Sequence, residues 1–322
     1  MSVTTKLLLF GVALIALFAG AVGIGQAVGP VDPAPAVDHG DMGEDDAEVT
    51  AAETGDAGAT TLPKGLMVAQ NGYAFRLAEP TAAAGDGVPV TFTIEGPDGS
   101  PVTQYDVEHE EDLHLIAVRR DFSGFQHVHP EMAEDGTWTT DLDLTAGQWR
   151  LFADFKATGA EAVTLGNDLA VRGRFRPAEP LATDSLTSTV DGYTVTLDGD
   201  LTAGEEAELT LTVTRDGEPV TDLEPYLGAY GHLVALRAGD LAYLHVHPEG
   251  APGDGVTDPG PDVVFFAEVP SPDRYHLYLD FKHEGVVRSA AFTVTGSAAA
   301  GSGAPHAEES DDVADHGSGD AH

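Results

Sequence analysis

Short runs in which apolar and polar residues alternate cover the chain from about residue 63 to residue 296. The stretch from Leu209 to Val213 is one such run, and Gly, Asp and Pro mark the turns between runs. Alternation with a period of two is typical of strands that bury one face, whereas an amphipathic helix repeats its apolar residues every three or four positions. The pattern therefore predicts an all-β protein over this range.

The pattern of strands occurs twice. The stretch 91–103 matches 209–221, and other short segments match at a similar separation. Internal repetition of this kind predicts tandem copies of one structural unit. Six or seven short strands in each copy are typical of an immunoglobulin-like β-sandwich. We therefore expect two tandem immunoglobulin-like domains, over residues 63–180 and 185–296, with the Pro- and Gly-rich insertion 250–262 forming a loop.

An uncharged apolar segment precedes these domains. It runs from Leu7 to Ile24, directly after Lys6. At about 18 residues it is just long enough to cross a membrane, and the basic residue before it favours export of everything after it. We expect residues 1–25 to be a transmembrane signal anchor or, if the chain is cleaved near Ala19, a signal peptide. Either outcome places the protein at the cell membrane or beyond, with the bulk of the chain extracytoplasmic.

Acidic segments of low complexity flank the two predicted domains. Residues 26–62 and the tail 297–322 are rich in Ala, Gly, Asp and Glu and have no apolar periodicity. Segments of this composition are expected to be disordered spacers, because they cannot bury enough apolar surface. The tail also carries His306, His316 and His322, so weak capture of metal ions is a second interpretation.

Charge and cysteine content narrow the classes of partner. The chain has 54 acidic and 15 basic residues and a formal net charge of −39. A field of this sign repels nucleic acid and attracts cations, although it also serves solubility or growth in salt. There is no cysteine, which excludes disulfides and thiolate ligands and leaves imidazole, carboxylate and thioether groups as potential metal ligands.

A histidine motif is the most informative part of the sequence. The segments 114–130 and 232–248 are equally long, begin with His and end with His-Val-His-Pro. Each has the apolar runs and central turn of a β-hairpin. Because side chains alternate between the faces of a strand, the three histidines of each copy are expected on one face. They are His114, His127 and His129 in the first copy and His232, His245 and His247 in the second.

The second copy has more groups that bind metal ions. His276 stands where the first copy has Arg150, and Asp280 lies four residues further along the same predicted strand. Either residue is a candidate fourth ligand, whereas an inward-facing Arg150 would repel a cation. Asp154 is the counterpart of Asp280 in the first copy. The sequence therefore predicts a working metal site in the second copy and leaves the first in question.

Two interpretations of the histidines stay open at this stage. Three imidazoles on one face form a site for a divalent transition metal, and the affinity order favours copper over zinc. Histidines at a strand end can instead bond backbone groups and serve the fold alone. We find no serine-hydrolase, zinc-protease or nucleotide-binding motif, so we do not expect an enzyme. The candidate functions are metal storage, delivery or resistance and, alternatively, a structural or adhesion stalk without metal.

The hairpin segments also carry a resemblance. Residues 114–130, residues 225–248 and the stretch 278–285, behind an apolar N-terminal segment, resemble a group of uncharacterised exported bacterial proteins that is common in actinobacteria. The resemblance implies an extracytoplasmic, membrane-anchored protein with a role in heavy-metal handling. It implies no particular activity and no particular set of ligands. The first copy departs from the second before the leading histidine, where Asp112-Leu113 replaces Tyr230-Gly231.

Overall fold

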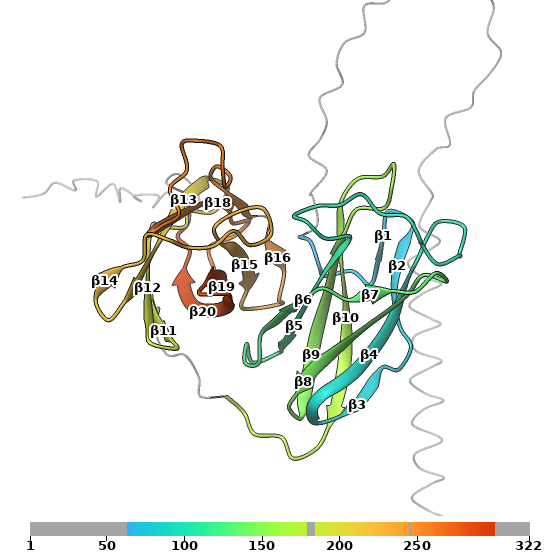
Figure 1. The fold of residues 1–322 in the computed structure, drawn as a ribbon. Helices are drawn as coiled ribbons and strands as arrows, with labels where there is room; N and C mark the ends of the chain where they lie inside the picture. Colours follow the sequence, from blue (N-terminus) through green and yellow to red (C-terminus); the bar gives the residue numbers. More distant parts are fainter. Residues whose placement is uncertain (1–62, 179–183, 245, 300–322) are drawn as a thin grey trace, which may run out of the picture. The chain divides into compact units, whose positions relative to one another are not determined.

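The computed structural model describes residues 63–178, 184–244 and 246–299. Within these ranges the chain forms strands, turns and bends but no helix. The strands are β1 Ala69–Gln70, β2 Tyr73–Leu77, β3 Thr81–Ala83, β4 Gly85–Glu95, β5 Leu113–Arg119, β6 Gln126–Val128, β7 Glu131–Met132, β8 Thr137–Leu144, β9 Gly147–Phe155, β10 Val163–Arg172, β11 Thr187–Val190, β12 Tyr193–Asp198, β13 Glu206–Arg215, β14 Glu218–Pro219, β15 His232–Arg237, β16 Tyr243–Leu244, β17 Val246–Pro248, β18 Asp262–Glu268, β19 Arg274–His283 and β20 Val286–Thr295. Figure 1 shows them in two groups that follow each other along the chain.

The first group of strands is an immunoglobulin-like sandwich. One sheet has the order β1-β2-β4-β8-β7 and the other the order β3-β10-β9-β5-β6. The short β3 pairs in parallel with β10, while the other pairs in these sheets are antiparallel. Two sheets of four or five strands with this alternation of strands between the sheets are typical of the immunoglobulin fold.

The second group repeats this topology. Its sheets have the orders β11-β12-β13-β18-β17, with β14 beside β13, and β16-β15-β19-β20. Each sandwich encloses its own apolar core, around Trp149 in the first and around Tyr275, its counterpart, in the second. The prediction of two tandem immunoglobulin-like β-sandwiches is therefore confirmed.

A third apolar cluster joins the two sandwiches. It consists of outward-facing side chains from β5 and β9 of the first repeat and from β15, β16, β19 and the turn before β16 of the second. The ring of Phe125 stacks on that of Tyr278 with centroids 4.0 Å apart, and Phe152 lies 5.6 Å from Tyr243. Phe125 is the counterpart of Tyr243, and Phe152 of Tyr278, so exchanging the repeats turns one pair into the other. Equivalent sheet faces therefore pack on one another.

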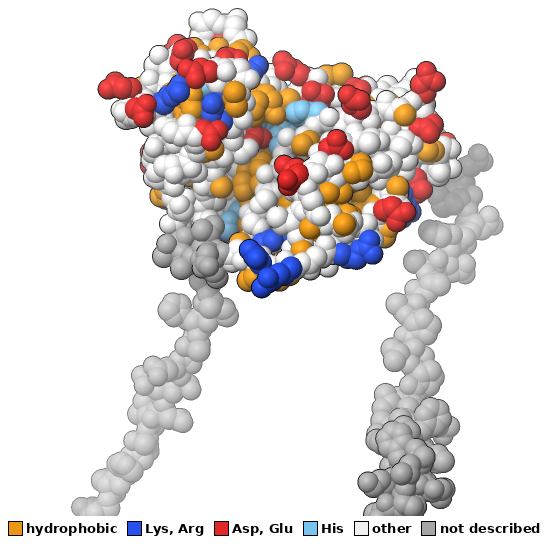
Figure 2. Space-filling view, turned by 60° about the horizontal axis from the view of Figure 1, so that its bottom comes forward, with side chains coloured by type: hydrophobic (Ala, Val, Ile, Leu, Met, Phe, Trp, Pro, Cys, Tyr) orange, Lys and Arg blue, Asp and Glu red, His pale blue; other side chains and the backbone are white. Residues whose placement is uncertain are grey.

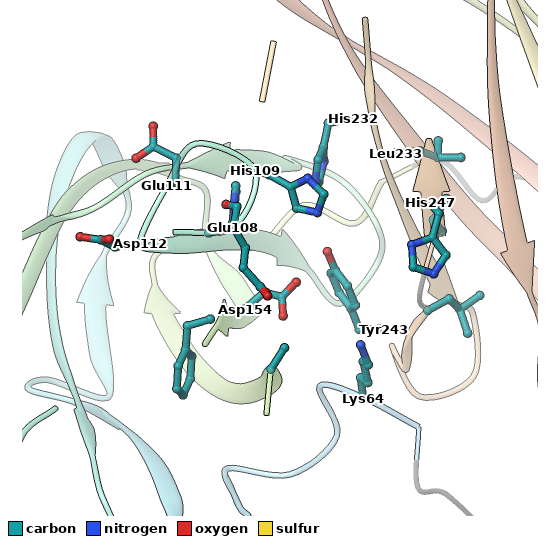
Figure 3. A pocket seen from close by; sticks show the side chains of 15 residues that line it. Lys64, Glu108, His109, Glu111, Asp112, Asp154, His232, Leu233, Tyr243 and His247 are labelled. Carbon is teal, nitrogen blue, oxygen red and sulfur yellow. The ribbon is translucent and has the colours of Figure 1, made fainter. Parts of the chain in front are cut away.

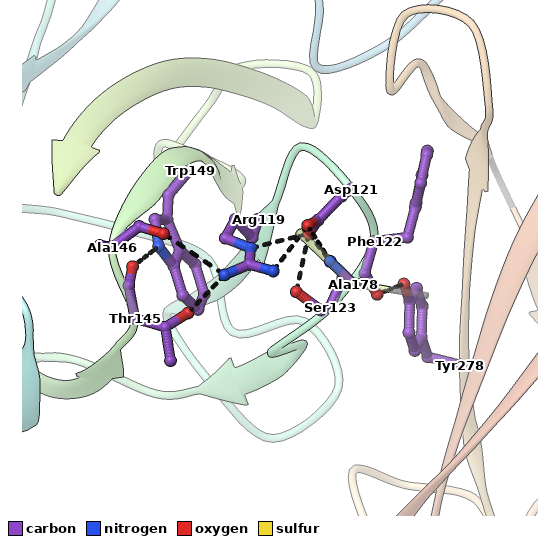
Figure 4. Close-up of polar contacts among 9 residues, drawn as sticks. All are labelled: Arg119, Asp121, Phe122, Ser123, Thr145, Ala146, Trp149, Ala178 and Tyr278. Carbon is purple, nitrogen blue, oxygen red and sulfur yellow. Dashed lines mark hydrogen bonds and ion pairs between the residues drawn. The ribbon is translucent and has the colours of Figure 1, made fainter. Parts of the chain in front are cut away.

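Polar contacts at the β5–β6 turn reinforce this packing (Figure 4). Arg119 donates to both carboxylate oxygens of Asp121, at 2.8 and 2.6 Å. Asp121 also accepts from the backbone N–H of Ala178, which lies at the end of the first domain. Next to it, the carbonyl oxygen of Phe122 accepts a 2.8 Å hydrogen bond from the Tyr278 hydroxyl of the second repeat. Burial alone would raise the pKa of Asp121, but these donors hold it well below its usual range.

The predicted membrane segment Leu7–Ile24 and the acidic segments 26–62 and 300–322 lie outside the described residues. Where the structure describes the chain, no helix has the length and apolar character needed to cross a bilayer. The N-terminal anchor therefore stays a prediction from the sequence.

We predict that the aromatic pair Phe125 and Tyr278 contributes directly to the coupling of the two sandwiches. Parallel rings at this separation gain about 0.5–1.5 kcal/mol beyond the apolar area that they bury. A double-mutant cycle with Phe125→Ala and Tyr278→Ala, measured by denaturant unfolding, should return a coupling free energy in that range. The same cycle on Phe125 and Val287, which is exposed on the second sandwich, should return none; equal values in both cycles would contradict the contact.

Candidate metal centre

The β5–β6 hairpin places three histidines of the first repeat on one face. Ile116 lies opposite His127, so His114, two residues before Ile116, shares a face with His127 and with His129. Their ligand nitrogens all lie within 4.8 Å of one another. The parity predicted from the sequence is therefore present in the first copy.

Hydrogen bonds fix the ring orientation of two of these histidines. His114 donates from Nε2 to the carbonyl oxygen of Glu108, at 3.0 Å. A carbonyl can only accept, so Nε2 carries the proton and a neutral His114 presents a lone pair at Nδ1. His127 donates from Nδ1 to a carboxylate oxygen of Asp280, at 2.9 Å, which leaves its Nε2 as the free lone pair.

These two lone pairs point at each other. The distance from His114 Nδ1 to His127 Nε2 is 3.1 Å. Two neutral imidazole lone pairs repel at this separation, so the contact requires a shared cation, either a proton or a metal ion. Two nitrogens bound to one tetrahedral metal, each at 2.0–2.1 Å from it, lie about 3.3 Å apart. The spacing therefore suits a metal ion with little movement of either ring.

The second repeat contributes Asp280 and His232. These residues lie directly opposite each other on β19 and β15, as Asp154 and His114 do on β9 and β5. Asp280 is 1 % exposed and accepts a very short hydrogen bond from the hydroxyl of Ser289. Together with His127, Asp280 and His232 form a second group whose ligand atoms lie within 4.8 Å of one another. His127 belongs to both groups.

Two ring nitrogens in this cluster have no hydrogen-bond partner among the described residues. They are Nε2 of His129 and Nδ1 of His232, and both are buried. A buried polar atom without a partner costs free energy unless something satisfies it. A metal ion that accepts these lone pairs would satisfy both atoms, so the donor set fits a metal on grounds of hydrogen bonding as well as distance.

Burial keeps His114, His129 and His232 in the protonation state that binds metals. Burial lowers the pKa of His114 to about 3 and that of His129 to about 4, and the neighbouring histidines add to both shifts. Burial and the same neighbours hold the pKa of His232 well below its usual range. These three imidazoles are therefore neutral at pH 7, which is the form that binds metals.

A cavity of about 430 Å³ opens beside the cluster. His109, Tyr243 and His247 project into it from three sides in Figure 3, and His114, Asp154 and His232 also line it. The sequence analysis missed His109. Its ring centroid lies 6.1 Å from that of His114 and 6.0 Å from that of His232.

The signal for His109 was weak because the second copy lacks it. Leu227 is its counterpart there, at the same left-handed position of an equivalent loop, with φ of 55° against 50° for His109. Figure 2 shows that acidic side chains, in red, are spread over the face of the molecule on which histidine surface, in pale blue, is visible.

Several residues predicted for the site lie elsewhere. His276 is opposite Leu236, four residues along β19 from Asp280, and its ring stacks on Phe122 with centroids 3.8 Å apart. His247 is exposed on β17, which pairs with β18 of the other sheet. β16 ends at Leu244 and β17 belongs to the other sheet, and His247 is in neither of the two groups.

His245 lies outside the described residues. Arg150 does not face the cluster: it donates to the carbonyl oxygens of Gly65 and Leu66 and pairs with Asp168. Arg150 is therefore not positioned to repel a cation at the histidines in the way that the sequence had suggested. Asp154 accepts from the hydroxyl of Thr164, and burial raises its pKa.

Both sandwiches match one known family. Residues 68–170 and 188–298 each match the family described as a domain of unknown function, DUF8832. The two matches together cover more than half of the chain. This protein belongs to the DUF8832 family. The two matched segments confirm that the DUF8832 unit occurs twice, once in each sandwich, and no curated protein matches the chain.

Solved structures show only distant similarity to this DUF8832 chain. The FdeC adhesin of Escherichia coli is 17% identical with a TM-score of 0.23, over 71% of this chain and 65% of that one. The adhesin InvE of Yersinia pseudotuberculosis is 12% identical with a TM-score of 0.21, over 69% of this chain and 58% of that one. The chain thus spans less than two thirds of either adhesin structure.

We predict that His276 makes the fold sensitive to mild acid. Burial, and then the charge of Arg274, lower the pKa of this side chain to about 4 from an unfolded value near 6.5. The contribution of a neutral His276 to the free energy of unfolding is fully present above pH 6.5. It is lost as the pH falls towards 4, because in that range the unfolded chain takes up a proton at this residue and the folded chain does not. His276→Gln should remove up to about 3 kcal/mol of this loss.

The measurement is the free energy of unfolding of wild type and His276→Gln at several pH values between 7.5 and 4. The free energies of unfolding of the two proteins should change with pH in the same way above pH 6.5. Below pH 6.5 that of wild type should fall more steeply. Parallel curves over the whole range would show that His276 titrates normally in the folded state.

Proposed function

We propose that this protein binds a divalent transition metal ion through His114, His127 and His129. The observation that carries the proposal is the 3.1 Å separation of His114 Nδ1 and His127 Nε2, which is close to the spacing of two nitrogens on one metal ion. The orphaned Nε2 of His129 lies in the same group and supplies a third nitrogen. Asp280 orients His127 in the way that carboxylates orient metal-bound histidines in many proteins.

The ligand chemistry favours copper over zinc. Imidazoles with a nearby carboxylate and no thiolate suit Cu(II), Zn(II) and Ni(II), and Cu(II) is the tightest-binding of these three for a given set of such ligands. The strongly negative charge of the chain raises the local concentration of any cation. Storage, delivery or resistance to excess metal outside the cytoplasm, at the membrane, is the role that these properties fit.

A second candidate function is a structural or adhesion stalk. Two immunoglobulin-like sandwiches with separate cores, in contact through equivalent faces, can each form an apolar core without a metal ion. This function rests on the fold alone, whereas metal binding rests on the histidine cluster. Metal titration separates the two.

We predict that the full chain binds Cu(II) or Zn(II) and that His127→Gln lacks one of the binding sites of wild type. Removal of His127 takes away the residue shared by both groups, so affinity at this site should fall by at least about 100-fold. Isothermal titration calorimetry at pH 7.5 measures it. His276→Gln, which removes a buried histidine outside the cluster, is the matched control and should retain the site.

Circular dichroism and thermal unfolding without metal would establish that each variant is folded. Histidines outside the cluster are present in wild type and in His127→Gln, so they contribute the same background to both. If wild type and His127→Gln give the same titration with every first-row metal, the histidines serve the fold and the stalk is the better explanation.

A further inference from the structure

The candidate metal centre draws on both sandwiches. His114, His127 and His129 of the first repeat form one group, and His127 forms a second group with His232 and Asp280 of the second repeat. Within the cluster, a 2.9 Å hydrogen bond from His127 to Asp280 links the two repeats. We propose that the bound metal acts as a clamp between the two domains, with His232 completing its coordination from the second repeat. This inference rests on the proposed metal site and adds a mechanical role to it.

The position and state of His232 support this assignment. Its ring centroid lies 4.6 Å from that of His127 and 5.8 Å from that of His114, and it stacks nearly parallel to His114. Its Nδ1 is buried and has no partner among the described residues. His232 therefore brings a buried nitrogen without a partner from the second domain to the side of His127, the residue that both groups share.

The histidines lie next to the apolar contact between the two domains. His114 lies on β5 beside Ile116, and His232 lies on β15 beside Val234; both apolar residues belong to the cluster that joins the sandwiches. The histidines therefore occupy one end of the same contact between β5 and β15. At its other end the Tyr278 hydroxyl binds the carbonyl oxygen of Phe122. A metal at the histidine end would fix the contact at a second point.

Without the metal this end of the contact is poorly matched. His114 Nδ1 and His127 Nε2 can share only a proton there, and the buried Nδ1 of His232 has no partner among the described residues. The buried Asp280 carboxylate accepts from His127 and Ser289 and adds negative charge beside the histidines. A divalent cation held by residues of both domains would bind best when the domains are docked, so its binding and their docking would be thermodynamically linked.

The test measures the distance between the domains with and without metal. The chain has no cysteine, so Glu134→Cys and Val256→Cys introduce two unique sites for spin labels, both at exposed positions, one on each sandwich. Double electron–electron resonance on the full labelled chain uses Zn(II), which is diamagnetic and leaves the labels unperturbed. We expect a broad distribution of distances in chelator and a narrow one with zinc.

His232→Gln and Asp280→Asn test the contribution of the second domain. Each should weaken zinc binding about 10–100-fold, the range observed when groups that orient or complete a metal site are removed. Each should also leave the distance distribution broad at a zinc concentration that narrows it in the parent. His276→Gln, a histidine change on the same strand as Asp280, should behave like the parent.

The outcomes separate this inference from the proposed function. If zinc binds with unchanged affinity in His232→Gln, or if the distribution is equally narrow with and without zinc, the clamp is wrong while the site of His114, His127 and His129 stands. If zinc does not bind the parent chain at all, the proposed metal site fails and the clamp fails with it.

Discussion

Packing between equivalent sheet faces is the constraint on which the rest of the structure depends. In an ordinary immunoglobulin-like sandwich each sheet buries one face and exposes the other. Here the strands at the centre of the joining sheets are buried on both faces: every residue of β5 is buried, and β19 is buried from Tyr275 to Phe281. Imidazoles that would otherwise lie on a solvated surface are enclosed as a result. Their depressed pKa values and orphaned nitrogens follow from that enclosure.

The fold and the parity of the histidines could be predicted from the sequence because both depend on local patterns. A period of two determines which side chains share a face, so His114, His127 and His129 meet as expected. The contact between domains could not be predicted, since a hairpin pattern does not say which outer faces will meet. One sign of it was present in the sequence: Leu115 to Val118 is continuously apolar, which is typical of strands buried on both sides.

The part of the site that departed from expectation did so for identifiable reasons. The sequence predicted a site within the second copy and left the first in question, because the hairpin pattern concerns each copy by itself. In the structure His232 meets His127 across the contact, and the strand that follows Leu244 moves to the other sheet. The two copies also differ in the loop before the leading histidine, where His109 and Glu111 of the first copy correspond to Leu227 and Ala229 of the second. The two repeats therefore contribute different residues to the site although their histidine motifs match.

The exchange relation between the aromatic pairs has a further consequence for assembly. A face that packs on its own counterpart can in principle pack on the same face of another molecule, as the halves of a symmetric dimer do. Covalent connection of the two sandwiches sets their effective concentration with respect to each other, which for short connections reaches the millimolar range. At lower protein concentrations the contact within one chain therefore prevails. The tandem arrangement thereby keeps a surface suited to self-association occupied within a single molecule.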